Sequence, residues 1–323
     1  MSGTPLPLAD LLAPIGTELF FERHWENEPL HIRGRASRFY EALLTHRDVE
    51  AAIASGGLRY PAIQLARDGR FLAAEAFTRS IRSGDDVFTG IPNLDRVRAE
   101  YRSGATISLP GFHRAWRPLG AFAAAVEEQV DHAVHTNVYI TPGNAAGFSA
   151  HYDTHEVFVL QIAGSKRWQI DKPLLPLPHR GQPFDPRGDR PSVPFLKVDL
   201  AAGDLLYLPR GFVHATTTSD SFSVHVTLGV TVYTWVELLA EWVQSCKHHP
   251  AFRRALPPGF AGRGDVRQSL KQQLPLMVAE LARLTDYDRL VEGFAQRVRS
   301  ARAGGRSDFS ADVVAVAPQS PRA

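Results

Sequence analysis

Two histidines and one aspartate are spaced so that they could bind a metal ion together. His151 and Asp153 stand at positions i and i+2, and on a β-strand such residues point to the same face. His214 supplies a second imidazole further along the chain. Two imidazoles and one carboxylate on one side of a metal leave three coordination positions open, which is the arrangement of non-heme Fe(II) oxygenases. His151, Asp153 and His214 are therefore predicted to be the metal ligands of a catalytic centre.

The residues that precede His214 add a second signal. Gly203, Pro209 and Gly211 stand at the spacing of the second cupin signature, in which glycine and proline turn the chain so that the histidine faces the inside of a β-barrel. A His-x-Asp pair alone is a weak signal in a chain with 13 histidines. The two patterns together are specific, and they predict a metal site inside a barrel.

From about Trp25 to Trp235 the sequence resembles the JmjC-type cupin hydroxylases, and in particular the ribosomal oxygenases, which hydroxylate a residue of a ribosomal protein. The resemblance rests on five segments, which are Asn137-Val138-Tyr139, His151-Tyr152-Asp153, Lys166-Arg167-Trp168, Leu206 to Gly211 with His214, and Ser223 to Gly229. These enzymes fold as a double-stranded β-helix, the cupin or JmjC jelly roll. The resemblance therefore implies a mainly β fold with flanking helices and a C-terminal helical unit.

The same resemblance implies how the cosubstrate is held. The position that matches Lys166 supplies the cation for the distal carboxylate of 2-oxoglutarate, Tyr139 and Thr227 hydrogen-bond this cosubstrate, and Asn137 lies beside the iron. Only five of the 36 basic residues of the chain are lysines, so a lysine at this position is notable. The implied cofactors are Fe(II), 2-oxoglutarate and dioxygen.

The activity that the resemblance implies is hydroxylation of a side chain in a protein or peptide. A ribosomal protein is the candidate substrate, with the β-carbon of an arginyl or histidyl residue as the site. A second hypothesis assigns the same chemistry to a small molecule or a peptide natural product. The first hypothesis is the leading one, and the second would be favoured by the lack of a winged helix, with which the resembling enzymes often end and for which the last twenty or so residues are too few.

Two further hypotheses remain open. One is a cupin that binds metal or a partner without turnover, against which the intact triad and Lys166 argue. The other is lysine demethylation, which uses the same iron chemistry and requires a pocket shaped to a methylated ammonium.

Three other polar residues near these motifs are expected to have different roles. His155 is not expected to be a ligand, because at i+4 from His151 on a strand it would crowd Asp153. His225 shares the face of Thr227 and is expected to be a packed interior histidine. Arg210 is expected either to contact the substrate at the rim or to be exposed in a turn.

The elements that must position these residues follow from hydrophobic periodicity and turn residues. Residues 8–55 predict short helices with a strand at 29–32, and 58–65 predicts a strand that runs into a turn at Asp68-Gly69. A helix is predicted over 117–132, and strands over 137–140, 156–162, 166–170, 205–208 and 222–232. The strands 156–162 and 166–170 are predicted to form a hairpin, and residues 173–196 a proline-rich connection.

These elements divide the chain into three parts. Residues 1–232 are predicted to form the catalytic domain, 233–300 a helical unit and 301–323 a disordered tail. In the resembling enzymes such a helical unit mediates dimerisation, so a homodimer is expected.

The composition is that of a globular protein, with 44% hydrophobic and 22% charged residues. A formal net charge of +2 provides no general field for nucleic acid or acidic lipid, so no direct nucleic-acid partner is expected. No apolar stretch reaches roughly 18 residues, so no membrane span is expected. The single cysteine, Cys246, and an N-terminus without the pattern of a secretion signal predict a cytoplasmic protein.

Overall fold

The computed structural model describes residues 6–189 and 194–304. The chain divides into two compact units, the first ending at Val232 and the second beginning at Tyr233. Residues 301–304 belong to the last helix, α9 (Tyr287–Gly304), so the predicted tail does not begin at residue 301. The rest of that predicted tail lies outside the described residues.

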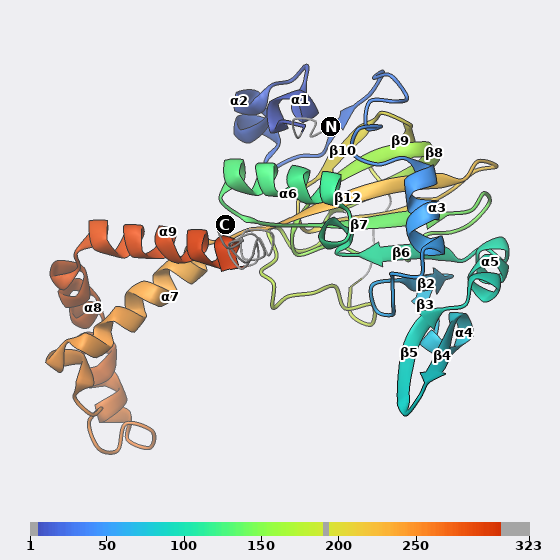
Figure 1. The fold of residues 1–323 in the computed structure, drawn as a ribbon. Helices are drawn as coiled ribbons and strands as arrows, with labels where there is room; N and C mark the ends of the chain where they lie inside the picture. Colours follow the sequence, from blue (N-terminus) through green and yellow to red (C-terminus); the bar gives the residue numbers. More distant parts are fainter. Residues whose placement is uncertain (1–5, 190–193, 305–323) are drawn as a thin grey trace, which may run out of the picture. The chain divides into compact units, whose positions relative to one another are not determined.

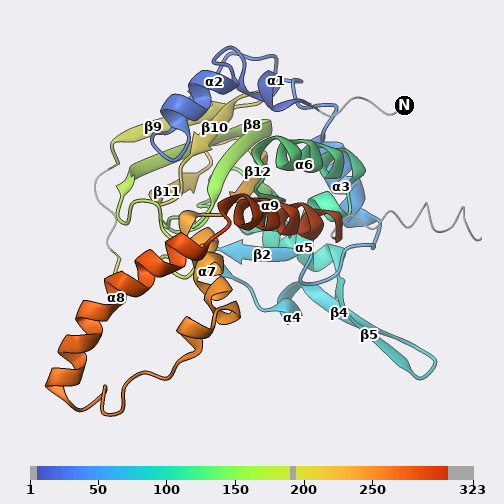
Figure 2. The same cartoon turned by 90° about the vertical axis from the view of Figure 1, so that its left-hand side faces the viewer.

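The first unit is built on antiparallel strands (Figure 1). The larger sheet has the order β1-β10-β8-β12-β7-β6-β2-β3. Its strands are β1 (Leu30–Ile32), β2 (Gln64–Arg67), β3 (Arg70–Phe71), β6 (Thr106–Pro110), β7 (Ala133–Thr141), β8 (Glu156–Pro173), β10 (Leu205–Leu208) and β12 (Ser223–Thr231). Two further strands, β9 (Leu196–Ala201) and β11 (Phe212–Thr217), pair with β8, and β4 (Thr78–Ser83) pairs with β5 (Asp86–Pro92) in a separate hairpin that extends away from the unit in Figure 2.

The long strand β8 belongs to both layers of the barrel. Residues 156–164 pair with β10 and β12, whereas residues 165–173 pair with β9 and β11. The predicted hairpin between 156–162 and 166–170 is therefore wrong. Gly164 has a φ of +65°, and a Cβ at this position would lie 1.8 Å from the carbonyl oxygen of Phe222. Glycine here lets the strand bend from one sheet to the other without reversing.

Two hydrophobic clusters hold these layers together. One joins the outer face of the larger sheet to the helices and includes Phe122, Val138 and Phe158. The other lies between the two layers and includes Val159 and Trp168. Because neighbouring residues of a strand face opposite sides, β8 contributes alternate side chains to both clusters. The inner cluster lies beside the pocket described below.

Helices cover the outer face of the larger sheet, where α6 (Arg117–Val130) and α3 (His46–Ala54) lie across it in Figure 1. The half-buried side chains of Thr45 and Asp48 form a capping box that starts α3. The remaining helices of this unit are α1 (Leu8–Leu12), α2 (Thr17–Leu19), η1 (Phe20–His24), α4 (Ala74–Phe77), α5 (Leu94–Arg102) and η2 (Phe112–Arg114). The prediction of a mainly β jelly roll with flanking helices is confirmed.

The second unit is entirely helical in its described part. It consists of α7 (Trp235–Ser245), η3 (Cys246–His248), η4 (Pro250–Arg253), α8 (Gly264–Leu284) and α9. The Trp242 indole donates to Thr285 Oγ1 at 2.6 Å and joins α7 to the end of α8. In the described parts of the chain, no helix is both long enough and apolar enough to cross a membrane.

Candidate active site

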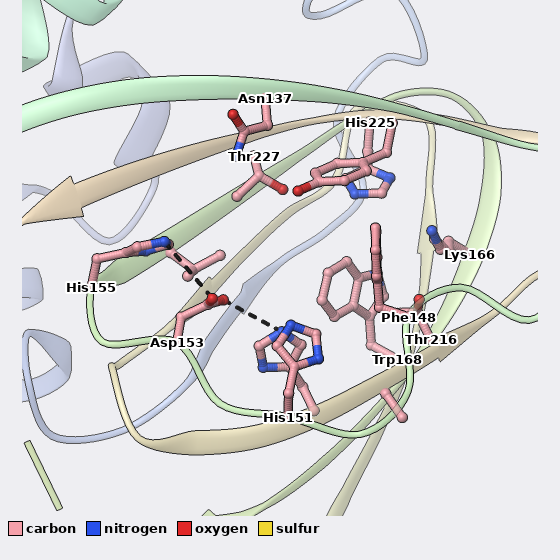
Figure 3. Close-up of a pocket in the computed structure, with 14 residues that line it drawn as sticks. Asn137, Phe148, His151, Asp153, His155, Lys166, Trp168, Thr216, His225 and Thr227 are labelled. Atoms are coloured by element: carbon pink, nitrogen blue, oxygen red, sulfur yellow. Dashed lines mark ion pairs between the residues drawn. The ribbon is translucent and has the colours of Figure 1, made fainter. Parts of the chain in front are cut away.

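The predicted metal ligands lie in one pocket formed by β7, β8, β11, β12 and the segment before β8 (Figure 3). All seven residues that the sequence analysis singled out for metal and cosubstrate line it. The complete lining is Asn137, Tyr139, Phe148, His151, Asp153, His155, Val157, Lys166, Trp168, His214, Ala215, Thr216, His225 and Thr227. Strand pairing has thus brought together residues from distant parts of the sequence.

The three predicted ligands converge. One ligand atom from each of His151, Asp153 and His214 lies within 4.8 Å of the others. His151 and His214 face each other in an isolated antiparallel bridge, with N···O distances of 3.1 and 2.8 Å. Residues 151–153 do not form a regular strand: His151 lies in this isolated bridge, and the carbonyl oxygen of Asp153 accepts a hydrogen bond of 3.0 Å from the backbone N–H of Gly211. The tertiary contact with β11, rather than strand periodicity, places them.

Both histidines are oriented as metal ligands require. Nδ1 of His151 lies 2.7 Å from the carbonyl oxygen of Ser149, and Nδ1 of His214 lies 3.1 Å from that of Phe212. A hydrogen on Nδ1 that is donated to these carbonyls leaves the Nε2 lone pair free. Burial, together with the neighbouring His151, lowers the pKa of His214 to about 4, so its imidazole is neutral at pH 7.

The carboxylate of Asp153 is ionised in the same pocket. Burial by itself would raise the pKa of Asp153, but the surrounding imidazoles, led by His155 and followed by His214 and His151, lower it below its ordinary value. Neutral imidazoles and an ionised carboxylate are the forms that bind a divalent cation. The residues present therefore fit a metal such as Fe(II).

Lys166 provides an unpaired cation deep in the pocket. Its side chain is buried at 3% exposure, and its ammonium donates to Thr141 Oγ1 at 3.1 Å. Within the described residues no carboxylate forms an ion pair with it, and burial lowers its pKa to about 7. A buried ammonium without a counter-ion is unfavourable, so an anionic ligand would stabilise it.

The space beside Lys166 is kept open by a glycine. A Cβ at Gly147 would lie 2.1 Å from Thr216 Oγ1 and 3.5 Å from Lys166 Nζ. The site therefore offers a cation and hydroxyl groups to one end of a small dicarboxylate, as 2-oxoglutarate requires.

Asn137 and Thr227 lie across the pocket from the metal ligands in Figure 3, and Tyr139 lines the same pocket. Burial raises the pKa of Tyr139 to about 12, so its hydroxyl remains a hydrogen-bond donor. The side-chain oxygen of Asn137 accepts a hydrogen bond of 3.1 Å from the backbone N–H of Gly111, which orients the amide. These polar groups come from β7 and β12. The two strands are paired, and Thr227 of β12 lies opposite Asn137 of β7.

Sequence reasoning missed several residues of this site. Thr141 is fully buried and hydrogen-bonds Lys166, and Phe148 and Thr216 line the pocket. A signal for Thr141 existed, because it follows Tyr139 by two positions and shares its face on a strand. Phe148 and Thr216 carry no comparable signal in the sequence.

The three residues that were given other roles are placed as follows. His225 is buried and stacks on Tyr139 with ring centroids 5.0 Å apart, as expected of an interior histidine. His155 lines the pocket beside Asp153 and is outside the group of converging ligand atoms. Both predictions for Arg210 are wrong, because its side chain is buried at 5% exposure.

Arg210 lies in a buried charge network. It donates to Glu156 Oε1 at 2.7 Å and also pairs with Glu26. The Tyr207 hydroxyl donates to the other oxygen of Glu156 at 2.5 Å. The network joins the N-terminal segment to β8 and β10, so Arg210 holds the barrel together instead of contacting a ligand.

We predict that Arg210→Met destabilises the protein by about 3–5 kcal/mol, because it leaves the Glu156 carboxylate buried without its cation. Urea denaturation followed by circular dichroism measures this change. Arg167→Met is the matched control, since Arg167 pairs with Asp199 on the surface and its loss should cost much less. Equal midpoints for the two variants would contradict the prediction.

A family model matches the part of the chain that forms this pocket. Residues 113–238 match the JmjC domain family. The protein carries a JmjC domain. Every residue predicted to bind metal or cosubstrate lies within the JmjC domain, and the family prediction is confirmed.

Some known proteins are similar to this chain over a longer stretch than the JmjC domain. The chain is 26% identical to human "Ribosomal oxygenase 1" over 301 residues, which cover 87% of this chain and 45% of that protein. It is 30% identical over 266 residues to "Bifunctional lysine-specific demethylase and histidyl-hydroxylase NO66" of Drosophila grimshawi, covering 78% of this chain and 35% of that protein. The chain thus spans less than half the length of these curated relatives.

Solved structures share the fold. The Escherichia coli ribosomal oxygenase YcfD in complex with cobalt and succinic acid matches with a TM-score of 0.51 at 15% identity, covering 85% of this chain and 69% of that one. This likeness supports the jelly-roll architecture around the JmjC domain.

Proposed function

We propose that the protein is an Fe(II)- and 2-oxoglutarate-dependent hydroxylase that acts on a side chain of another protein. The observation that carries the proposal is the convergence of His151, Asp153 and His214 in one pocket with the buried cation of Lys166. The names of the relatives agree with it, since one is a ribosomal oxygenase and another a histidyl-hydroxylase. The related YcfD structure holds a metal and succinic acid.

In this proposal each group of residues has a separate task. His151, Asp153 and His214 hold Fe(II). Lys166 binds the distal carboxylate of 2-oxoglutarate, Tyr139 and Thr227 hydrogen-bond the cosubstrate, and Asn137 lies beside the metal. When bound, iron and 2-oxoglutarate supply the chemistry that reduces dioxygen, releases succinate and carbon dioxide, and places one oxygen atom on a C–H bond.

The protein contributes orientation and exclusion of water rather than a general base. Lys166 lies on β8, and the metal ligands lie on β11 and in the segment before β8. The cosubstrate is therefore held by rigid elements. The aromatic rings of Phe148 and Tyr139 pack edge to face at 5.7 Å and shield one side of the pocket. Shielding protects a reactive oxidant from bulk water.

The pocket favours a histidyl over an arginyl side chain as substrate. Among the described residues, Asp153 is the only carboxylate that lines it, and in the proposal this carboxylate binds metal. A guanidinium would therefore enter without a carboxylate of the pocket lining to pair with, because Asp153 binds the metal and Lys166 is paired with the cosubstrate. A neutral imidazole meets no such penalty and can pack on Phe148. The proposed substrate is a histidyl residue of a ribosomal protein.

Intact mass spectrometry of ribosomal proteins from cells with and without the gene tests this function. One protein should lose the mass of a single oxygen atom on deletion, and fragmentation should place the change on histidine. No shift in any ribosomal protein, with continued formation of succinate from 2-oxoglutarate by the purified enzyme, would overturn the proposed substrate and direct the search to peptides and small molecules.

We also propose that the helical unit forms a homodimer. Its described helices expose large apolar side chains, including Trp235 at 75%, Leu274 at 66% and Leu276 at 68% exposure. Only Leu281 and Val298 are buried hydrophobic residues among the described part of this unit. Apolar surface of this kind is typical of an interface.

Sedimentation velocity at micromolar concentration should show a dimer. Replacing Leu274 and Leu276 together by glutamate should shift the protein to a monomer, because charged side chains are costly in an apolar interface. The matched control is Leu177→Glu, at an exposed leucine of the first unit. A wild-type monomer would remove the dimer and leave the chemistry untouched.

We place the protein in the cytoplasm. Cys246 is a free thiol and the only cysteine of the chain, which suits a reducing compartment. Fractionation of cells that express the tagged protein tests this location.

A further inference from the structure

We propose that a second cavity, on the outer face of the larger sheet, binds a free fatty acid or a similar single-chain carboxylate. This cavity has a volume of about 920 Å³ and lies between α3, α5 and the strands β6, β7 and β12. In the described parts of the chain, none of its lining residues also lines the active-site pocket. The inference therefore does not depend on the proposed function.

The floor and walls of the cavity are apolar. Ile107 of β6, Ile140 of β7 and Val224 of β12 are neighbours across paired strands and face the helices. Val49 of α3 and Val97 of α5 are buried in the walls. Protein interiors are close-packed and leave few voids larger than a water molecule, so an apolar space of this size is unusual. Its volume lies within the range of small-molecule pockets, about 300–1,000 Å³.

The charged groups of the lining select the sign of the ligand. Arg47 of α3 and Arg98 of α5 line the cavity and are exposed, so both guanidinium groups are available to a head group at the mouth. Arg47 forms no ion pair among the described residues, and Arg98 pairs only at 3.6 Å with Asp95, whose side chain is 95% exposed. Glu50 is the one carboxylate among the described lining residues. Two guanidinium groups against one carboxylate favour an anionic ligand.

A single-chain carboxylate matches both parts of the cavity. Its hydrocarbon chain can cover the apolar floor, where each buried CH₂ group strengthens binding by about fourfold. Its head group can remain at the mouth beside the two arginines. The exposed ring of Phe222, which packs edge to face on His46 with ring centroids 6.3 Å apart, adds apolar surface to the lining. A cationic amphiphile would gain the same burial but would be repelled by the arginines.

Two variants with matched controls separate the two parts of the proposal. Ala51→Trp places a large ring in the cavity from α3, and Ala121→Trp, at an exposed alanine of α6 outside the lining, is its control. Arg98→Glu reverses a charge at the mouth. Its control is Arg102→Glu, which lies one turn further along α5 and also outside the lining.

The experiment is calorimetric titration of the delipidated full-length protein with sodium dodecanoate below its micelle-forming concentration. We expect saturable binding of one molecule per chain, and binding of decanoate that is weaker by about 10-fold, because two fewer CH₂ groups are buried. Ala51→Trp should weaken dodecanoate binding by about 10-fold or more, since the ring takes the space of several CH₂ groups. Arg98→Glu should weaken it by about threefold or more, and dodecyltrimethylammonium should bind wild type more weakly than dodecanoate by a similar factor. Both controls should match wild type.

Several outcomes would overturn the inference. One is the absence of saturable dodecanoate binding to wild type. Another is binding that Ala51→Trp leaves unchanged, because the ligand would then lie elsewhere, such as on the exposed apolar side chains of the helical unit. Circular dichroism shows whether each variant is folded. If Ala51→Trp does not fold, equal affinities of Arg98→Glu and Arg102→Glu, or equal affinities of dodecanoate and dodecyltrimethylammonium, would overturn the site.

Discussion

Replacing Asp153 by alanine is expected to abolish succinate formation and to remove tight metal binding. The three ligand residues converge within 4.8 Å, and Asp153 supplies the only carboxylate among them. Two imidazoles without that charge hold a divalent cation weakly and leave the metal free to exchange. The expected loss of turnover is at least about a thousandfold, since no other described residue of the pocket can replace the carboxylate.

Two measurements check this result. Succinate released from 2-oxoglutarate reports turnover, and Mn(II) titration reports the metal. Asp199→Ala is the control, because Asp199 lies on β9 and pairs with the exposed Arg167. The control should keep both properties. Succinate formation at the wild-type rate in Asp153→Ala would exclude this residue as a ligand.

Replacing Lys166 by alanine is expected to raise the 2-oxoglutarate concentration for half-maximal turnover by about 10- to 100-fold. A hydrogen bond to a charged group contributes about 1.5–3 kcal/mol, and the buried ammonium of Lys166 has no other carboxylate partner among the described residues. Mn(II) binding should remain, because Lys166 is not a ligand. An unchanged 2-oxoglutarate requirement would remove Lys166 from this role.

The pH dependence of cosubstrate binding offers an independent check. Burial lowers the pKa of Lys166 from 10.5 to about 7, and a bound carboxylate would raise it again. Above pH 7 binding must therefore take up a proton, so the affinity for 2-oxoglutarate should fall as the pH rises, by up to about tenfold per pH unit. Lys166→Arg should remove this dependence, because a guanidinium stays charged. Calorimetric titration between pH 6.5 and 8.5 measures it.

The same pKa shift affects the stability of the protein without cosubstrate. Because the folded pKa of Lys166 lies below the unfolded value of 10.5, the unfolded chain binds more protons between about pH 7 and 10.5. The contribution of Lys166 to the free energy of unfolding should therefore increase as the pH rises through this window.

Much of the active site could be predicted from local sequence patterns. The spacing of Gly203, Pro209 and Gly211 before His214 marked the barrel histidine, and the resemblance to JmjC hydroxylases marked Lys166. Tyr139 and Thr227 lie on neighbouring strands whose alternation sends one face to the pocket and the other to the helices. Residue type and a period of two are local properties, and they are readable without the fold.

Only the tertiary structure decided which distant residues meet. Arg210 pairs with Glu156, 54 positions away, and with Glu26, 184 positions away, so no local pattern could show that it is buried. The bend at Gly164 turned a predicted hairpin into one strand shared by two sheets, and the bridge between His151 and His214 placed Asp153 where His155 could face it. Sequence determined the chemistry that was available, whereas strand pairing over long distances determined burial and partners, because those depend on contacts that spacing along the chain does not encode.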